Sequence, residues 1–191
     1  SIAAMGRWEP DAAGRLREAA MALYTEQGYE RTTVAEIADR AGVTARTFFR
    51  HFADKREVLF AGSEELERRM VDALIAAPPS AGPMDAIAAA LLAAAGLFGE
   101  RHDYSRRRQA VIAATPELRE RELIKLASLA SAFAEALRQR GVAPAVASLA
   151  AETGVAVFRV AFEQWAAEPD GPDLADVMRS TLIDLAGLTT S

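Results

Sequence analysis

The sequence predicts an all-α protein, with an N-terminal three-helix helix-turn-helix domain and a helical C-terminal domain, about nine helices in total. Three observations support this prediction. Apolar residues recur at helical spacing along almost the whole chain. Strand-like alternation of useful length is absent, and no Asn-Gly or Asp-Gly dipeptide joins two such stretches. Capping residues and helix breakers divide the apolar segments into separate helices.

The N-terminal part is divided by caps and glycines. A capping side chain accepts a hydrogen bond from the first turn of a helix, and glycine readily adopts the left-handed conformation that ends one. In chain order, these signals are the stop at Gly28, the capping box of Thr33 with Glu36, the break at Gly42, the cap at Thr44, and the cap of Asp54 with Glu57. They predict three short helices between about residues 11 and 53, and a longer fourth helix from Asp54 to about Ala77.

The C-terminal part follows a proline-rich loop, Pro78 to Pro83. Pro116 occupies the first turn of one later helix, where a missing backbone N–H costs nothing. The later helices are expected at about 84–99, 104–114, 116–140, 144–167 and 172–188. We therefore divide the chain into a helix-turn-helix domain at 1–55 and a second helical domain at 56–191.

Composition restricts the class of protein. The chain has 191 residues, 51% of them hydrophobic and 26% charged, as expected of a folded soluble protein. The absence of cysteine excludes disulfides and thiol chemistry and suits a reducing cytoplasm. The longest apolar run, 86–98, is too short to span a bilayer, and the first residues lack the features of a signal peptide and suggest a tail left by processing or cloning. These features predict a cytoplasmic protein with no membrane contact.

The stretch from Gly42 to Phe52 is unusual because it combines aromatic and cationic residues without any acid. On a helix, Phe48 and Phe52 share one face, and Arg46 and Arg50 share the opposite face. The first 60 residues carry equal numbers of acidic and basic side chains, so the net charge of −5 arises entirely in the rest of the chain. The pattern predicts a buried aromatic face and an exposed cationic face, which suits a phosphate-rich partner.

The span from Leu16 to Leu59, which contains GYERTTVAEIADRAGVTARTFFRHFADKREVLF, resembles the DNA-binding domain of the TetR family of transcriptional regulators. The resemblance implies an all-helical homodimer whose second domain binds a small lipophilic effector. Effector binding would release a palindromic DNA operator, so the expected function is that of a ligand-released repressor.

The resemblance also assigns roles to individual residues. It implies that Thr33 and Lys55 contact phosphates, and that the start of the third helix reads bases. The residues implied in DNA binding are Thr33, Thr44, Ala45, Arg46, Thr47, Phe49, Arg50, His51 and Lys55. Arg46 has the geometry to pair with a guanine edge. Phe49 departs from the family, which usually has a tyrosine at this position whose hydroxyl binds a phosphate. Phe49 lacks the hydroxyl, and its ring would pack against a sugar or a thymine methyl group.

The second domain carries a weaker resemblance. The stretch RRRQAVIAATPELRERE, residues 106–122, is similar to TetR-type regulators that sense acyl-coenzyme A thioesters. It implies that Arg106, Arg107 and Arg108 meet the phosphates of such a ligand; the alternative is that they form a solvated basic helix start. The candidate ligand-binding residues are Leu91, Ala95, Phe98, Val111, Phe133, Phe158 and Phe162. An apolar stripe of this kind could also be ordinary core.

Other classes of protein fit less well. No nucleophile motif, phosphate loop or metal-binding motif occurs, and His102-Asp103 has no third metal ligand within reach in the sequence. We therefore expect no enzymatic activity, no cofactor and no metal. The alternative function is a helical adaptor that retains the helix-turn-helix only as a scaffold.

The last two helices are expected to form the dimer. In the 144–167 helix, the predicted interface combines small residues with aromatic ones: Ala147, Ala150, Ala151, Gly154, Phe158, Phe162 and Trp165. In the 172–188 helix, the predicted interface is the apolar stripe of Leu174, Val177, Met178, Thr181, Leu182 and Leu185. Packing against the same pair of helices from a second chain would give an isologous four-helix interface. The alternative is that both helices cover their own domain and that the contact between chains is small.

Overall fold

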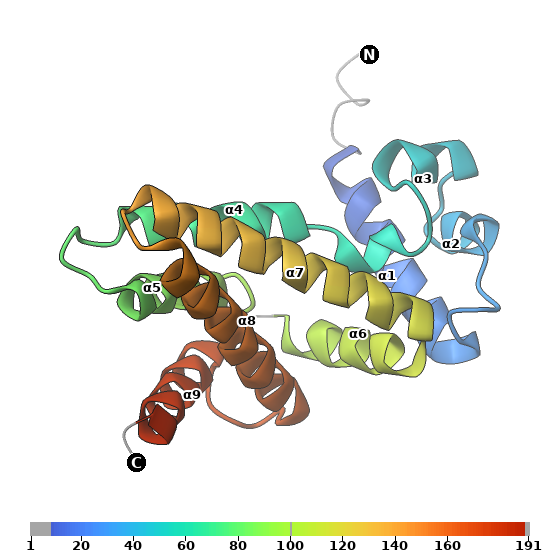
Figure 1. Ribbon diagram of the computed structural model, residues 1–191. Coiled ribbons are helices and arrows are strands. Elements are labelled where there is room, and N and C mark those ends of the chain that lie inside the picture. The colour runs from blue at the N-terminus through green and yellow to red at the C-terminus, as the bar shows by residue number, and fades with distance from the viewer. Residues whose placement is uncertain (1–8, 100, 190–191) are drawn as a thin grey trace, which may run out of the picture. The chain divides into compact units, whose positions relative to one another are not determined.

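The computed structural model describes residues 9–99 and 101–189, and over these ranges the chain is helical without strands (Figure 1). This confirms the predicted all-α fold with an N-terminal helix-turn-helix. The elements are α1 Glu9–Gln27, α2 Val34–Arg40, α3 Ala45–His51, the short 3₁₀ helix η1 Glu57–Phe60, α4 Ser63–Ala76, α5 Pro83–Ala95, α6 His102–Ala114, α7 Pro116–Gln139, α8 Pro144–Ala167 and α9 Leu174–Thr189.

Two compact units make up the described chain. The first contains the residues up to Ala61 together with Arg107–Arg119, and the second contains Gly62–Arg106 and the chain from Glu120 onward. In the first unit, α1 packs against α2, α3 and η1, and α2 packs against α3. Fully buried side chains of this unit come from α1, α2, α3 and the first turn of α7: Leu16, Ala20, Met21, Ile37, Phe48 and Leu118.

The predicted caps and breakers in the first unit are confirmed. The Thr33 hydroxyl accepts a hydrogen bond from the Glu36 backbone N–H at 3.2 Å, and the Glu36 carboxylate accepts one from the Thr33 backbone at 2.8 Å. Thr44 accepts from the Thr47 N–H at 3.2 Å and so begins α3. Gly28 and Gly42 both have positive φ, 87° and 70°, where glycine is favoured over residues with a Cβ atom.

The predicted fourth helix is wrong in one respect. Asp54 does accept a hydrogen bond from the Glu57 N–H at 2.9 Å, but the helix it begins is only the one-turn η1. Gly62 then adopts a left-handed φ of 86°, and α4 begins at Ser63. A continuous helix from Asp54 to Ala77 is therefore impossible, because a residue in the left-handed region interrupts the ladder of helical hydrogen bonds.

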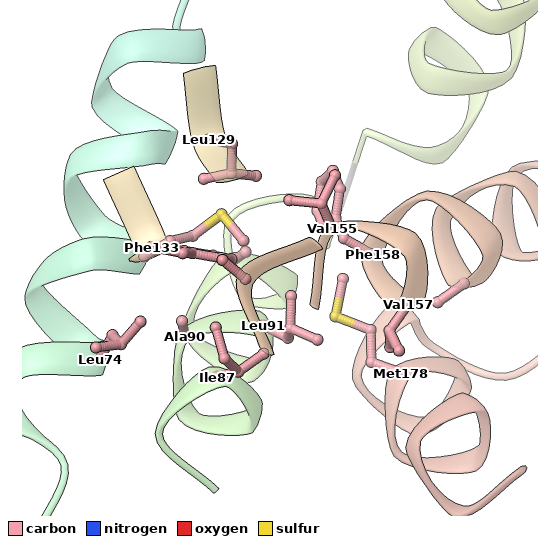
Figure 2. Packing of buried hydrophobic residues seen from close by; sticks show 14 of the residues in the cluster. Leu74, Ile87, Ala90, Leu91, Leu129, Phe133, Val155, Val157, Phe158 and Met178 are labelled. Carbon is pink, nitrogen blue, oxygen red and sulfur yellow. The ribbon is translucent and has the colours of Figure 1, made fainter. Parts of the chain in front are cut away.

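The second unit is built around α5, which packs against α4, α8 and α9. Figure 2 shows Ile87, Ala90 and Leu91 of α5 among buried side chains from neighbouring helices. A close approach in this core lies between α5 and α8. A Cβ atom added to Gly154 would lie only 2.6 Å from Cγ2 of Ile87, so the absence of a side chain at Gly154 is what allows the two helices to meet.

Arg140 stabilises the C-terminal end of α4 through its guanidinium group. Its Nη1 donates to the carbonyl oxygens of Ile75 at 3.1 Å and Ala77 at 2.8 Å, and its Nη2 donates to that of Pro78 at 2.7 Å. The last carbonyl groups of a helix have no partner within the helix, and a cation is also favoured at this end of the helix dipole. The bonds connect residues more than sixty positions apart, and sequence spacing gave no indication of them.

Within residues 9–99 and 101–189, one helix, α8, is long and apolar enough to cross a membrane by length and composition alone. Of the most apolar 18-residue window of α8, 44% is buried inside the chain. A core helix of a globular unit has the same composition, and α8 contributes a large share of the buried side chains of the second unit. The apolar character of α8 is less evident in the linear sequence than that of the 86–98 run, because Glu152, Arg159 and Glu163 interrupt it.

Candidate nucleic-acid interface

The third helix presents the two faces that the sequence predicted. Phe48 is completely buried and Phe52 is 8% exposed, with their ring centroids 5.6 Å apart. Arg46 and Arg50 lie on the exposed face of α3. The inner face is therefore held by aromatic packing, and the outer face is exposed.

The outer face combines cationic, small and aromatic side chains. Thr44, Ala45 and Arg46 are exposed and Thr47 is half-buried. Among the residues that the structure describes, Arg46 has no hydrogen-bond or ion-pair partner, so its guanidinium group is free to bind one. Phe49 is 57% exposed, an unusual environment for an aromatic ring, and it contacts Phe48 edge-on with ring centroids 5.4 Å apart.

Not every cationic side chain near α3 is available. Arg40 forms a two-bond ion pair with Glu26, with nitrogen–oxygen distances of 3.1 and 2.8 Å. This pairing neutralises one end of the acid-free stretch, which linear sequence could not reveal because Glu26 lies on α1. His51 is half-buried, and its Nε2 is buried with no hydrogen-bond partner among the described residues.

The polar groups of Thr33 already have a partner within the chain. Its hydroxyl donates to a carboxylate oxygen of Glu36 at 2.9 Å, and its backbone N–H donates to the same oxygen at 2.8 Å. These hydrogen bonds, the backbone one first, hold the pKa of Glu36 below its usual value. A phosphate that approached Thr33 would therefore meet an ionised carboxylate.

Lys55 is also engaged within the chain. Its Nζ donates to the carbonyl oxygens of Tyr29 at 2.8 Å and Thr32 at 3.0 Å, and a third carbonyl oxygen, of Glu30, lies 3.5 Å away. The ammonium group also lies 4.2 Å from the centroid of the Tyr29 ring. Sequence reasoning missed this arrangement. The one available signal is that Lys55 is one of only two lysines in a chain with twenty arginines.

The predicted effector residues fall into two groups. Leu91, Ala95, Phe133, Phe158 and Phe162 are buried in the apolar cluster of the second unit, and Phe98 packs partly buried against that cluster. Phe98, Phe158, Phe162 and Trp165 form an aromatic group, with 5.1 Å between the ring centroids of Phe98 and Phe162. Val111, by contrast, belongs to the compact unit that contains the helix-turn-helix.

The three consecutive arginines of α6 each have a partner within the chain. Arg106 pairs with Asp103 at 3.1 Å, and Arg107 with Glu18 at 3.6 Å. Arg108 donates from Nε to the Leu59 carbonyl oxygen at 2.7 Å, and its guanidinium carbon lies 5.1 Å from the Phe60 ring centroid. Of the three, Arg106 is the most exposed, and its partner is an exposed residue of the same helix.

His102 is held by α8. Its Nε2 lies 2.7 Å from the Trp165 carbonyl oxygen, which requires the ring nitrogen to donate, and the two rings meet edge-on at 4.7 Å. Within the described ranges, no group of three His, Asp or Glu side chains could hold a metal ion.

The structure places most of the predicted dimer-face residues in the core of their own unit. Most of the residues assigned to the interface are buried within their own chain, where they pack in the second unit: Ala147, Ala150, Ala151, Gly154, Phe158, Phe162, Trp165, Leu174, Val177 and Met178. Leu182 and Leu185 are half-buried against the same core. The small residues of α8 face inward because they accommodate the close approach of α5.

A different set of apolar side chains remains exposed on these helices. On α8 they are Val146, Leu149 and Val160, at 50%, 70% and 46% exposure, and on α9 they are Ile183 and Leu188, at 71% and 80%. Along α8, Val146, Leu149 and Val160 lie within one narrow sector of the helix surface. An exposed apolar stripe of this kind is typical of a surface that a partner covers.

A helix-turn-helix with an exposed arginine on its outer face, combined with a second helical unit, defines the class of helix-turn-helix regulators. Two family models match the chain. Residues 16–61 match the model described as bacterial regulatory proteins of the tetR family, and residues 81–189 match the model described as the MftR C-terminal domain. The chain belongs to the TetR family of regulators.

Individual relatives agree with this assignment. The transcriptional regulator TcmR of Streptomyces glaucescens is 41% identical over 81 residues, which are 42% of this chain and 35% of TcmR. The transcriptional repressor KstR2 of Mycobacterium tuberculosis is 41% identical over 63 residues, which are 33% of this chain and 30% of KstR2. The chain thus matches only about a third of the length of these curated relatives.

Similarity of structure extends over most of the chain. The crystal structure of FadR from Thermus thermophilus, a TetR family transcriptional repressor in complex with lauroyl-CoA, superposes with a TM-score of 0.56 at 25% sequence identity. The superposition covers 91% of this chain and 93% of FadR. The second unit is therefore similar in fold to a domain that accompanies a helix-turn-helix in another regulator.

Proposed function

We propose that this chain is a transcriptional repressor that binds a palindromic DNA operator as a homodimer and is released by a lipophilic effector, with an acyl-coenzyme A as the leading candidate. The observation that carries the proposal is the exposed Arg46 of α3, unpaired among the described residues, on the outer face of a TetR-family helix-turn-helix. A regulator of this kind acts in the cytoplasm, where its DNA is.

The DNA contacts follow from the outer face of α3. Arg46 and Arg50 carry the cationic groups, and Thr44, Ala45 and Thr47 are the small neighbours that allow a close approach to base edges. The exposed ring of Phe49 supplies an apolar contact to a thymine methyl group or a sugar. Thr33 and His51 complete the proposed contacts, Thr33 after its hydroxyl turns away from Glu36.

The homodimer is proposed to form through the exposed apolar stripe of α8 and the exposed residue Ile183 of α9. Leaving Leu149 and Ile183, each about 70% exposed, in water is unfavourable, and a second copy of the same pair of helices would cover both. A two-fold axis through such an interface makes the two recognition helices equivalent, and an operator with matching two-fold symmetry is then required.

The effector site is proposed in the second unit, at the aromatic group of Phe98, Phe158 and Phe162. Phe98 is the only one of these three that is more than 9% exposed, so it is the point at which an acyl chain would enter. Leu91, Ala95 and Phe133 lie deeper in the same apolar cluster (Figure 2 labels Leu91 and Phe133). The lauroyl-CoA bound by Thermus FadR supports this chemical class of effector.

The test begins with selection of a binding site from random duplex DNA by the purified protein. We expect a palindromic site whose affinity drops by roughly 10³–10⁵ between 50 and 200 mM salt, as for about 6–10 phosphate contacts. Arg46→Ala should relax the base preference at one position in each half-site. Failure to select any sequence would refute the regulator and would favour the helical adaptor.

The dimer and effector have separate tests. Leu149→Glu and Ile183→Glu should give folded monomers by light scattering, whereas the control Ser148→Glu, on an exposed residue of the same helix, should remain a dimer. Stable dimers in both Leu149→Glu and Ile183→Glu would place the interface elsewhere.

The effector is tested with a series of acyl-CoA thioesters, which should release the protein from the selected operator. Free fatty acids and coenzyme A alone serve as the comparison compounds. Lack of release by every compound would refute the effector class.

A further inference from the structure

We propose that Lys55 acts on DNA binding as a positioning residue, a clasp that closes the helix-turn-helix, and does not itself contact a phosphate. This inference rests on the proposed DNA-binding function. It differs from the role that the family resemblance implies for Lys55, and it follows from where the ammonium group lies in the structure.

The ammonium group is surrounded by backbone oxygens. Carbonyl oxygens of Tyr29 and Thr32 accept hydrogen bonds from Nζ at 2.8 and 3.0 Å, and the oxygen of Glu30 is 3.5 Å away. An ammonium group has three donors, and these three oxygens account for all of them. The Tyr29 ring covers the group from a further direction, at 4.2 Å from Nζ to the ring centroid.

These contacts join the two ends of the helix-turn-helix. Thr32 immediately precedes Thr33, the cap of α2, and Lys55 follows the last residue of α3 by four positions. A single side chain therefore joins two residues 23 positions apart, and α2, the turn and α3 lie between them. The backbone carbonyl of Lys55 in turn accepts a hydrogen bond of 2.6 Å from the Tyr24 hydroxyl on α1, so the clasp is fixed to the first helix as well.

The chemistry of the site explains why a lysine is present in an arginine-rich chain. Its ammonium group is compact and directs its donors in three directions, which matches carbonyl oxygens that converge on one point. The guanidinium group of arginine is planar and larger, and its donors diverge in one plane. An arginine would retain the positive charge at position 55 but would not reproduce the bonds to Tyr29 and Thr32.

This difference provides a test in which charge and position are separated. Operator affinity would be measured for the wild-type protein, Lys55→Arg and Lys55→Met over a range of salt concentrations. The matched controls are Lys125→Arg and Lys125→Met, which change the other lysine of the chain, in the second unit. Amide hydrogen exchange of residues 28–36 would be measured in the same proteins without DNA.

A positioning role predicts that Lys55→Arg and Lys55→Met both weaken binding about tenfold, as when the binding-competent arrangement falls to about a tenth of the population. It also predicts that the salt slope of Lys55→Arg stays at the wild-type value and that amide exchange of residues 28–36 accelerates in both variants. The Lys125 variants should match the wild type.

A phosphate contact predicts a different pattern, which would overturn the inference. Lys55→Arg would then bind like the wild type, and Lys55→Met would lose about 1.8 from the salt slope, about 0.9 for each protomer. If Lys55→Arg and Lys55→Met both bind the operator with wild-type affinity, the positioning role of Lys55 is also overturned. If both variants fail to fold, Tyr24→Phe, which removes the bond to the Lys55 carbonyl, should weaken binding without changing the salt slope. Unchanged affinity in Tyr24→Phe would refute the clasp. A wild-type protein that binds no DNA would instead refute the proposed function.

Discussion

Replacing Gly154 by alanine should destabilise the second unit, although alanine is the better helix former. The new Cβ atom would lie 2.6 Å from Cγ2 and 3.3 Å from Cδ1 of Ile87. Favourable carbon–carbon contacts lie at about 3.5–4.0 Å, so α5 and α8 would have to separate by roughly 1 Å or Ile87 would have to leave its rotamer. Ile87 is fully buried and branched at Cβ, which makes rotation of its side chain unfavourable.

The magnitude follows from two opposing effects. Overpacking of a filled core costs about 1–3 kcal/mol, and replacement of glycine by alanine within a helix returns about 1 kcal/mol. The net loss is therefore up to about 2 kcal/mol, equivalent to a decrease in Tm of as much as about 8 °C for a chain of this size. Urea denaturation at a fixed protein concentration measures the loss, since dimerisation would make stability depend on concentration.

Two further variants make the reasoning refutable. Ile87→Leu removes the Cγ2 branch, so the combination of Gly154→Ala with Ile87→Leu should show a favourable coupling of about 1 kcal/mol or more. Gly187→Ala, on α9, is the control, because a Cβ atom there meets nothing within 4 Å and only the helix-propensity gain remains. If Gly154→Ala stabilises the protein as much as Gly187→Ala does, the close approach does not limit packing.

Three other predictions concern single side chains. Arg140→Met should lower the stability of the second unit by about 2 kcal/mol or more in urea denaturation, since three carbonyl oxygens lose a charged donor, and an unchanged midpoint would contradict this role. Phe49→Tyr should keep the fold, because the ring is 57% exposed, and should bind the operator equally or up to about 1 kcal/mol more tightly, so loss of folding by circular dichroism would count against it. Glu36→Gln should destabilise the protein most at pH values above the ordinary pKa of a carboxyl group. The hydrogen bonds from Thr33 lower the pKa of Glu36, so the contribution of Glu36 to folding stability is lost as the pH falls through that lowered pKa. A stability difference between the variant and the wild type that stays constant from about pH 7 to about pH 3 would refute this prediction.

The sequence predicted the caps and helix ends of the helix-turn-helix well because local chemistry decides them. A capping box is formed by residues three apart, and a glycine that ends a helix acts within the same turn, so Thr33, Glu36, Thr44 and Gly28 could be assigned without any tertiary contact. Gly62 was the exception. A glycine within an apolar pattern is compatible with a continuous helix, and only the backbone conformation revealed the left-handed break.

The inner face of α8 could not be identified from periodicity. The helix is apolar on most sides, so both the small residues around Gly154 and the larger ones such as Leu149 were possible interface residues. The contact with Ile87, 67 positions earlier, decides which face is buried. The bonds of Lys55 were unpredictable for the same reason, since they connect positions 23 to 26 residues apart with no regular pattern.

The lysine clasp makes the protein unusually suitable for amine-directed chemistry. Apart from its N-terminus, the chain offers amine reagents only Lys55 and Lys125. To react, the Lys55 nitrogen must first leave the carbonyl oxygens of Tyr29 and Thr32, whereas no such bonds hold Lys125 among the described residues. Under brief acylation, we expect mass spectrometry to find Lys125 modified well before Lys55. The labelling rate at Lys55 would then report directly how often the helix-turn-helix opens, with DNA or effector present, without any engineered probe.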